Sequence, residues 1–295
     1  MSAIILDGKV TGKKLRENAK ERTTLLRKQG HTPCLAVILV GDNPASHSYV
    51  KAKEKALAEA GMEGRSLRLG GETSEAELLG VIKSLNADDS VHGILVQLPL
   101  PRHIREAVVI NAVDPRKDVD CFHRVNVGKL LLEEPGFLPC TPHGVIQLLR
   151  EHKIPTKGAH AVVIGRSNIV GKPLAMLLAR KEFNATVTMC HTGTKNLAFH
   201  TRQADILIAA VGQPGLITGD MVKRGAAVID VGVNRVSVAG ETGYRLTGDV
   251  VFEEAAQIAG WITPVPGGVG PMTIAMLMLN SLSAAEIRYG GKCGT

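Results

Sequence analysis

The sequence predicts an α/β protein of two domains, and three observations support this fold class. The chain has 295 residues, of which 44% are hydrophobic, enough for about two buried cores. Aromatic residues make up only 3%, while glycine occurs 32 times, a composition that favours helices packed closely on sheets over an all-β sandwich. Short, continuously apolar segments alternate with helical patterns, which is typical of a parallel sheet covered on both faces.

The first half of the chain contains three strand-like segments, each followed by a helical pattern. The pairs of strand and helix are 34–41 (CLAVILVG) with a helix from Pro44, 66–69 (SLRL) with 74–86, and 91–100 (VHGILVQLPL) with 105–113.

A second set of alternating elements follows a helical pattern at 141–152. Its strand-like segments are 160–165 (HAVVIG), 185–191 (ATVTMCH), 204–212 (ADILIAAVG), 226–232 (AAVIDVG) and 261–265 (WITPV). No strand follows the apolar helix that begins near 273, so we expect this helix to return to the first domain. The expected domains are therefore 1–140, completed by 273–295, and 141–272.

Charge and cysteine content exclude several classes of function. The net charge of +7 comes from scattered basic residues without interleaved aromatics, which argues against nucleic acid and favours small anionic ligands. Five cysteines form no CxxC pair, so neither a metal site nor a disulfide framework is predicted, and a reducing cytoplasm is expected. We expect neither a signal peptide nor a membrane span, because no long uncharged apolar stretch occurs.

A glycine-bearing turn in the second half is a candidate dinucleotide site. The segment 160–179 (HAVVIGRSNIVGKPLAMLLA) reads as strand, turn and helix, with Gly165 and Gly171 bracketing the turn. The spacing is neither GxGxxG nor a Walker loop, so an ordinary tight turn is the alternative. The following strand ends in HTGTK without a carboxylate that would repel a 2′-phosphate, and Arg166 can bind that phosphate, so we predict NADP over NAD.

A lysine in the first half lies on the apolar face of a predicted helix. The helix is bounded by Asn43 as a cap and by Gly61 as a stop signal. Helical spacing places Lys53 on the apolar face, beside Tyr49 one turn earlier. A side chain that reaches out to solvent is the ordinary alternative. A lysine partly withdrawn from water has a lowered pKa, which makes Lys53 a candidate acid or base.

Polar residues also follow a buried strand of the first half, at the sheet edge where ligands bind. Gln97 interrupts HGILVQLPL, and Asp118 and Asp120 follow in DPRKDVDCF. A strand-end glutamine that satisfies loop backbone, and a solvated charged turn, are the alternatives for these residues.

Taken together, the motifs resemble the bifunctional methylenetetrahydrofolate dehydrogenase/methenyltetrahydrofolate cyclohydrolase family of the bacterial FolD type. The resemblance covers nearly the whole chain. It rests on GDNPASHSYVKAK, HGILVQLPLP, KDVDCF, PCTPHG, VVIGRSNIVGKP, VIDVGVNR, GDV and TPVPGGVGPMT, in family order.

The resemblance implies a folate domain and a Rossmann-type NADP domain around a cleft, in a cytoplasmic homodimer of one-carbon metabolism and purine biosynthesis. It also implies tetrahydrofolate derivatives as substrates, and it assigns roles to individual residues. Lys53 would be catalytic, Gln97 would orient it, Tyr49 would stack on the folate, and Asp120 would bind the pterin. Expected cofactor contacts are Gly165, Arg166, Ser167, Gly171, Thr192 and Val233; expected cleft residues are Ser46, Thr141, Pro264, Gly267 and Gly268.

One position departs from the family pattern, which reads KDVDG where this chain has Cys121. If the backbone there needs a positive φ, a cysteine is strained and can displace Asp120. Two other functions stay open from the sequence: a different two-domain NADP oxidoreductase resembling shikimate dehydrogenase, and a catalytically silent folate-binding protein. The first leaves Tyr49, Lys53 and Gln97 unexplained, and the second predicts loss of Lys53 or Gln97.

Overall fold

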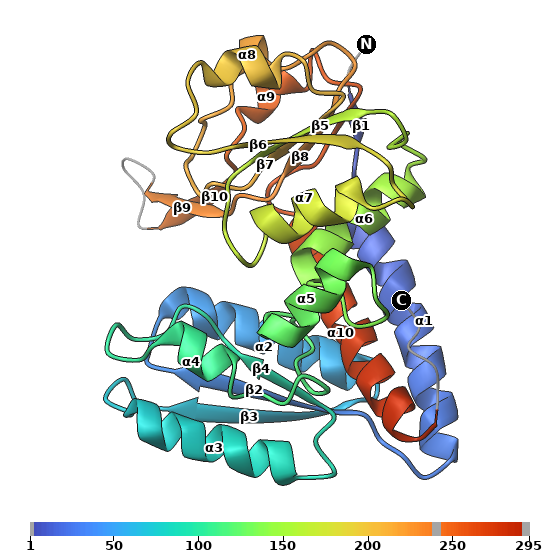
Figure 1. The fold of residues 1–295 in the computed structure, drawn as a ribbon, viewed down its shortest axis with the longest axis vertical. Coiled ribbons are helices and arrows are strands. Elements are labelled where there is room, and N and C mark those ends of the chain that lie inside the picture. Colours follow the sequence, from blue (N-terminus) through green and yellow to red (C-terminus); the bar gives the residue numbers. More distant parts are fainter. Residues whose placement is uncertain (1–2, 238–242, 291–295) are drawn as a thin grey trace. The chain divides into compact units, whose positions relative to one another are not determined.

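The computed structural model describes residues 3–237 and 243–290. Within them the chain forms two compact units. The six-stranded unit comprises Met1–Gly12 and Thr141–Thr273, and the three-stranded unit comprises Lys13–Cys140 and Ile274–Thr295. Each unit is built on a parallel sheet flanked by helices, so the predicted α/β class is confirmed (Figure 1).

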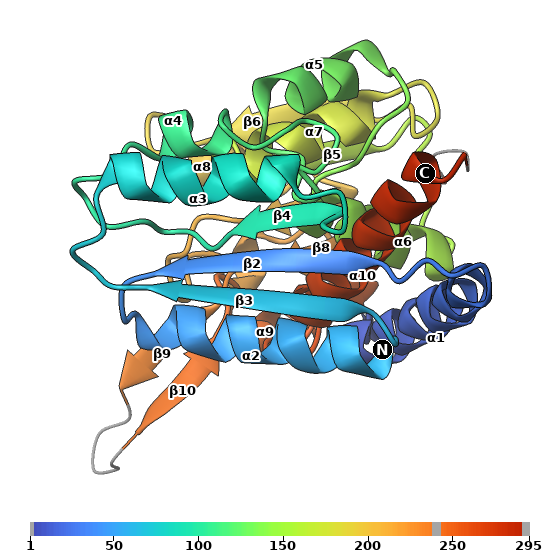
Figure 2. The ribbon, with the colours of Figure 1, turned by 90° about the horizontal axis from the view of Figure 1, so that it is seen from below.

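The sheet of the three-stranded unit has the order β3-β2-β4, and all its strands are parallel. Alternate side chains of the central strand enter two different cores, because successive residues of a strand point to opposite faces. Helices α2 and α3 lie on the two faces of the sheet (Figure 2). The elements are β2 (Cys34–Val40), β3 (Glu63–Leu69), β4 (Gly93–Val96), α2 (Pro44–Glu59) and α3 (Glu75–Ala87).

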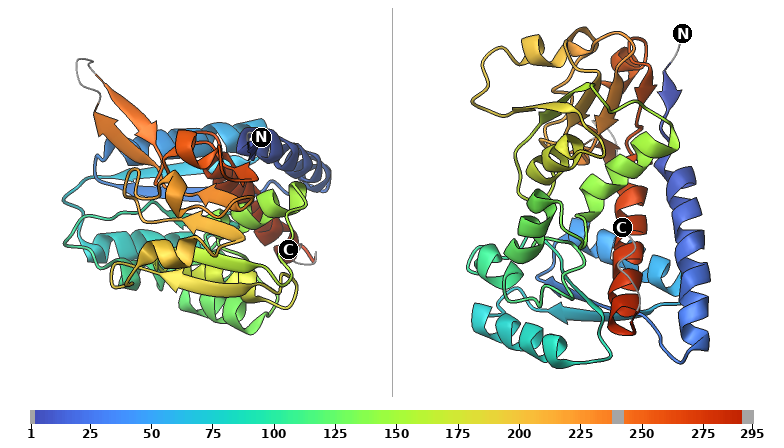
Figure 3. Two further views of the ribbon diagram at one scale, coloured as in Figure 1. Left: turned by 90° about the horizontal axis from the view of Figure 1, so that it is seen from above. Right: turned by 45° about the vertical axis from the view of Figure 1, so that its right-hand side comes forward.

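Helices α1 (Gly8–Lys28) and α10 (Val269–Arg288) run alongside each other over the residues that belong to the three-stranded unit, from Lys13 and from Ile274 onward (Figure 3). A bidentate ion pair between Arg22 and Glu286 joins them. Asn280 donates from Nδ2 to the carbonyls of Val119 and Leu138 at 2.7 and 2.9 Å. These contacts fix α10 against the loops of the three-stranded unit, which also contains α4 (Glu106–Ile110) and α5 (Arg124–Leu132).

The six-stranded sheet has the order β1-β11-β8-β7-β5-β6, with every pair parallel. Apart from β1 this is the doubly wound order 2-1-3-4-5, whose switch point lies between β5 and β7. Its strands are β1 (Ile4–Ile5), β5 (His160–Ile164), β6 (Thr186–Cys190), β7 (Ile206–Ala209), β8 (Ala227–Asp230) and β11 (Trp261–Ile262). Its helices are α6 (Cys140–Glu151), α7 (Gly171–Ala179), α8 (Leu197–Thr201), α9 (Phe252–Ala255) and the short η1 (Gly219–Met221).

Two features of the six-stranded unit differ from the sequence prediction. The N-terminal residues were expected in the first domain, but β1 pairs with β11, which assigns Met1–Gly12 to the six-stranded unit. An antiparallel hairpin of β9 (Asn234–Ser237) and β10 (Tyr244–Thr247) was not expected and projects beyond the sheet (Figure 1). Both involve short strands, which carry little periodic signal.

The start of the C-terminal helix also differs from expectation. We expected the helix to begin near 273, but α10 begins at Val269, so Thr273 lies one turn inside. Its hydroxyl faces the Val269 carbonyl and the hydroxyl of Thr141, at 3.4 and 2.9 Å. The glycine and proline residues of 263–268 end the strand, and those of 270–271 are accommodated in the first turn of the helix.

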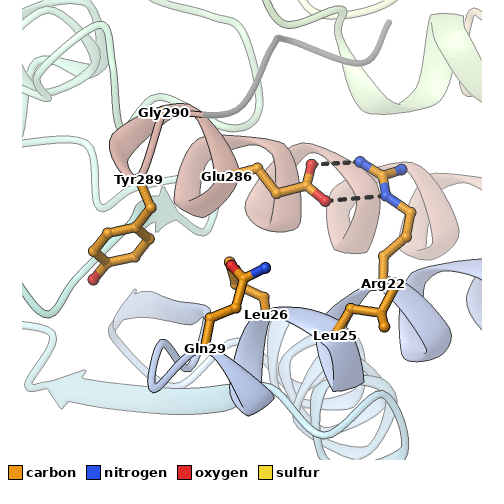
Figure 4. Close-up of a pocket in the computed structure, with 7 residues that line it drawn as sticks. All are labelled: Arg22, Leu25, Leu26, Gln29, Glu286, Tyr289 and Gly290. Atoms are coloured by element: carbon orange, nitrogen blue, oxygen red, sulfur yellow. Dashed lines mark hydrogen bonds and ion pairs between the residues drawn. The ribbon is translucent and has the colours of Figure 1, made fainter.

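A pocket of about 440 Å³ lies between α1 and the end of α10 (Figure 4). Tyr289 from this pocket stacks on His31 and contacts Nε2 of His92 through its hydroxyl at 3.1 Å. Because His92 precedes β4 and Gln97 follows it, the pocket and Gln97 lie at opposite ends of this strand.

The described cysteines, Cys34, Cys121, Cys140 and Cys190, are buried and form no disulfide with one another, and Cys293 lies outside the described residues. Among the described helices, none has both the length and the apolar character needed to cross a bilayer.

His92 makes the stability of the fold sensitive to acid. Its Nδ1 accepts the backbone N–H of Cys34 at 3.1 Å, and burial, with Arg288 and Lys117 nearby, lowers the pKa of His92 to about 4. In the unfolded chain this histidine titrates near its ordinary pKa of about 6.5. As pH falls from about 6.5 to about 4, the unfolded chain takes up the proton first, so folded-state stability is lost in that window.

We predict that between pH 7 and pH 4.5 the wild type loses about 2 kcal/mol more unfolding free energy than His92→Asn, measured by urea denaturation. Asparagine can still accept the Cys34 N–H but does not titrate. The exposed control His103→Asn should show the wild-type loss. Equal losses in wild type and His92→Asn would contradict the assignment.

Candidate active site

Helix α2 presents three predicted site residues from one face. Ser46, Tyr49 and Lys53 are spaced by three and four positions, which places them in successive turns. Asn43 accepts the backbone N–H of Ser46 at 3.4 Å, as expected of a cap. Ser46 is buried, whereas Tyr49 is 43% exposed and free to form one wall of a ligand site.

The amine of Lys53 is held by a hydrogen bond from the neighbouring strand end. Lys53 is only 8% exposed, and its Nζ donates to Oε1 of Gln97 at 3.0 Å. The amide of Gln97 is itself oriented, because its Nε2 donates to the Leu98 carbonyl at 2.8 Å. Gln97 follows β4, so the carboxyl end of that strand fixes the position of the lysine amine.

Three ionisable groups interact around this amine. Burial lowers the pKa of Lys53 from its ordinary value, and the Asp120 carboxylate opposes this shift. Burial raises the pKa of Asp120, with Lys53 acting in the other direction. The thiol of Cys140 hydrogen bonds to Asp120, and burial raises the pKa of that thiol well above its usual value. A lysine with a lowered pKa can take up and release a proton near neutral pH.

The loop that carries Asp120 has a left-handed residue at the position that departs from the family pattern. Cys121 has φ = 61°, the positive value that the sequence analysis considered. The cysteine is accommodated with its thiol buried and donating to the Phe137 carbonyl at 3.0 Å. The carboxylate of Asp120 still interacts electrostatically with the amine of Lys53. Asp118, the other candidate carboxylate of this loop, accepts the backbone N–H groups of Phe122 and His123 and has a structural role.

In the six-stranded unit, the predicted glycine turn connects β5 to the N-terminus of α7. Gly165 has φ = 117°, and a Cβ there would lie 2.2 Å from the Ala210 carbonyl oxygen. A Cβ on Gly171 would lie 2.2 Å from the carbonyl oxygen of Gly165. Only glycine allows this closure, which leaves Arg166 and Ser167 exposed beside the helix N-terminus. The Ser167 hydroxyl accepts the N–H groups of Val170 and Gly171 at 3.2 and 3.3 Å.

This turn fits the pyrophosphate of a dinucleotide. The N-terminus of α7 and the exposed guanidinium of Arg166 both favour an anion. At the end of the neighbouring strand β6, His191 donates its backbone N–H to the Thr194 hydroxyl at 2.9 Å, and Thr192 is exposed. Residues 191–195 contain no carboxylate, so this loop accommodates a ribose 2′-phosphate.

Other predicted residues of the six-stranded unit lie at the carboxyl ends of its strands. Val233 follows β8 and is exposed, and Pro264 follows β11. A pocket of about 760 Å³ at this edge is lined by Pro264 and Asp230 among other residues. Gly267 and Gly268 continue the turn after β11, where the N–H of Gly268 donates to the Pro264 carbonyl at 2.8 Å.

Sequence reasoning did not single out three polar residues at these sites. Cys140, beside Lys53 and Asp120, lies in PCTPHG, which entered only as part of the resemblance. Asp230 and Asp249 are buried carboxylates at the carboxyl edge of the six-stranded sheet. The signal for Asp230 was available, because it ends an apolar strand in the same way that Gln97 follows one.

Comparison with known proteins identifies the family. Residues 6–120 match the catalytic domain of tetrahydrofolate dehydrogenase/cyclohydrolase, and residues 139–289 match its NAD(P)-binding domain. The chain is 57% identical to the bifunctional protein FolD of Moorella thermoacetica, over 97% of this chain and all of that protein.

Solved structures of similar proteins agree. The bifunctional FolD methylenetetrahydrofolate dehydrogenase/cyclohydrolase of Campylobacter jejuni is 50% identical, with a TM-score of 0.93, over 97% of this chain and all of that chain. A Trypanosoma brucei FolD, complexed with NADP and an inhibitor, is 40% identical with a TM-score of 0.94, over 99% of this chain and all of that chain. The chain therefore belongs to the tetrahydrofolate dehydrogenase/cyclohydrolase family.

Proposed function

We propose that this protein oxidises 5,10-methylenetetrahydrofolate to 5,10-methenyltetrahydrofolate with NADP and then hydrolyses the product to 10-formyltetrahydrofolate. The observation that carries this proposal is the buried amine of Lys53, held by Gln97 and facing Asp120. The relatives named above are bifunctional enzymes of this family, and the one from Trypanosoma brucei was solved with NADP.

The predicted catalytic and substrate-binding residues each have a role in this proposal. NADP, when bound, supplies the hydride acceptor for the first step, which needs alignment of the reactants and no protein nucleophile. In the second step Lys53 Nζ moves protons while water adds and the folate ring opens. Gln97 orients that amine, Tyr49 stacks on the folate, and Asp120 hydrogen bonds the pterin. Ser46, Thr141 and the turn of Pro264, Gly267 and Gly268 contribute further substrate contacts.

The six-stranded unit binds NADP in this proposal. Gly165, Ser167 and Gly171 support the pyrophosphate, Arg166 binds the 2′-phosphate, and Thr192 and Val233 are further contacts. The absence of a carboxylate in residues 191–195 supports NADP over NAD.

The two other functions are less well supported. The shikimate dehydrogenase of Thermus thermophilus shares only the fold, at 17% identity and a TM-score of 0.51. A catalytically silent protein that only binds folate has no need for a buried amine with an oriented hydrogen-bond acceptor. Burying the amine costs desolvation energy, and binding by itself does not require it. We also propose that the protein is a cytoplasmic homodimer, as the sequence resemblance implies.

We predict that Lys53→Met lowers cyclohydrolase activity at least about 100-fold, because it removes the proton-transferring amine while keeping the length of the side chain. NADP affinity should stay within about two-fold, since the lysine belongs to the three-stranded unit. The assay is hydrolysis of supplied 5,10-methenyltetrahydrofolate. Lys55→Met, an exposed lysine on the same helix, is the control and should retain activity. Ring opening by the Lys53 variant would refute the role.

For Arg166 we predict that Arg166→Ser raises the KM for NADP about 10-fold to 100-fold, the worth of one charge-assisted hydrogen bond to phosphate. The KM for NAD should change little, because NAD lacks the 2′-phosphate. Initial rates with each dinucleotide measure both values. Arg202→Ser, which removes an exposed arginine paired with Asp220, is the control. Parallel losses with NADP and NAD would remove Arg166 from this role.

For Cys121 we predict that Cys121→Gly is more stable than Cys121→Ala by about 1 kcal/mol, because only glycine relieves the positive φ. Both variants lose the buried thiol, so the difference between their unfolding free energies reports the backbone strain at residue 121. Urea denaturation measures it. An alanine variant as stable as the glycine variant would show that the backbone at 121 is unstrained.

A further inference from the structure

Two carboxylates, to which the sequence resemblance assigned no role, are buried together at the carboxyl edge of the six-stranded sheet. Asp249 is 0% exposed and Asp230 is 4% exposed. Isolated carboxylates are costly to bury, so their partners must compensate. All the hydrogen bonds that their side chains make in the described structure are to N–H groups.

Asp249 connects the segment after β7 to the segment after β8. Its Oδ2 accepts the backbone N–H groups of Val211 and Gly212 at 2.7 and 3.0 Å. Its Oδ1 accepts the side-chain Nδ2 of Asn234 at 3.0 Å. Since these three partners are donors, a carboxylate is the side chain that satisfies them all.

Asp230 connects the segment after β8 to the segment that contains Asp249 and to the residue that follows β11. Its Oδ1 accepts the N–H groups of Gly232 and Asp249 itself at 3.0 Å each, and its Oδ2 accepts that of Val250 at 2.9 Å. The N–H of Asp230 donates to the Thr263 hydroxyl, which follows β11, at 2.7 Å. The segments after three neighbouring strands, β7, β8 and β11, are thus joined through the side chains of Asp249, Asp230 and Thr263.

Two glycines make room for these carboxylates. A Cβ on Gly232 would lie 2.2 Å from Oδ1 of Asp249, and a Cβ on Gly248 would lie 1.8 Å from Oδ2 of Asp230. Each carboxylate therefore packs directly on the backbone next to the other. This reciprocal arrangement leaves little freedom to the segments it joins.

The segments held by Asp249 border the switch point of the sheet. Strands β5 and β7 are neighbours there (Figure 1). The Ala210 carbonyl that Gly165 packs against immediately precedes Val211. On the other side, Val233 lies between Gly232, bound by Asp230, and Asn234, bound by Asp249. Asp249 thus fixes the backbone on which both the glycine turn and Val233 depend.

We propose that Asp249 is a positioning residue for NADP: it holds the segments after β7 and β8 in the geometry that the dinucleotide requires. The inference rests on the proposed function of this edge. Asp249 acts through Val211, Gly212 and Asn234 and does not touch the reacting atoms.

The test is Asp249→Asn, which keeps the size of the side chain but turns an amide NH₂ toward one of the three donors. We expect the Kd for NADP, measured by calorimetric titration, to rise at least about 10-fold, the effect of leaving one buried donor unsatisfied. Hydrolysis of supplied 5,10-methenyltetrahydrofolate, which needs no dinucleotide, should stay within about two-fold of wild type.

A double variant supplies the rescue. In Asp249→Asn with Asn234→Asp, the new amide oxygen can accept from Val211 and Gly212 while its NH₂ donates to the new carboxylate. We expect NADP affinity to recover to within about three-fold of wild type. Asp220→Asn, at an exposed aspartate of the same unit, is the matched control and should bind NADP as the wild type does.

A wild-type Kd in Asp249→Asn, or failure of the double variant to recover affinity, would overturn the inference. A parallel loss of NADP binding and cyclohydrolase activity with a lowered Tm would do the same, since it indicates general destabilisation. These results leave the proposed function intact. A wild-type protein that fails to bind NADP would overturn both.

Discussion

The burial of ionisable side chains at the carboxyl ends of parallel strands is the constraint on which both units depend. Parallel strands end together at one edge, where loop N–H groups lose their sheet partners and charged groups leave water. In the three-stranded unit an amine is buried and Gln97 accepts from it. In the six-stranded unit two carboxylates are buried and backbone N–H groups donate to them. In both cases the hydrogen bonds that offset desolvation also immobilise the functional groups.

The two units use opposite solutions to the same electrostatic problem. Around Lys53 the polar partners of the amine are side chains, and both Asp120 and burial shift the pKa of the amine. Around Asp249 the polar partners are two backbone N–H groups and the amide of Asn234, none of which titrates, so the loop geometry is fixed. The first arrangement suits a group that exchanges protons, and the second suits a surface that has to bind a large anion.

The sequence predicted the buried strands and Lys53 well because their signals are local. Continuous apolar runs marked the buried strands β2, β4, β5, β7 and β8, and helical spacing alone placed Lys53 on an apolar face. The positive φ of Cys121 was anticipated only through the glycine that the family has there. The hairpin β9–β10 was missed because its strands are short, and one of them, Asn234–Ser237, is mostly exposed. Asp249 was missed because its partners are largely backbone N–H groups, which every residue except proline possesses.

The pairing of β1 with β11 has a consequence for the folding of the chain. Strand Ile4–Ile5 pairs with Trp261–Ile262, so the six-stranded sheet is completed by a contact between segments far apart in the sequence. Helix α10, which follows β11, contributes its residues from Ile274 onward to the three-stranded unit, whose other part is Lys13–Cys140. Neither unit therefore forms its core from one continuous stretch of chain. Because long loops have to close before such cores are complete, we expect this chain to fold more slowly, and to expose apolar surface for longer, than a protein whose domains are each continuous in sequence.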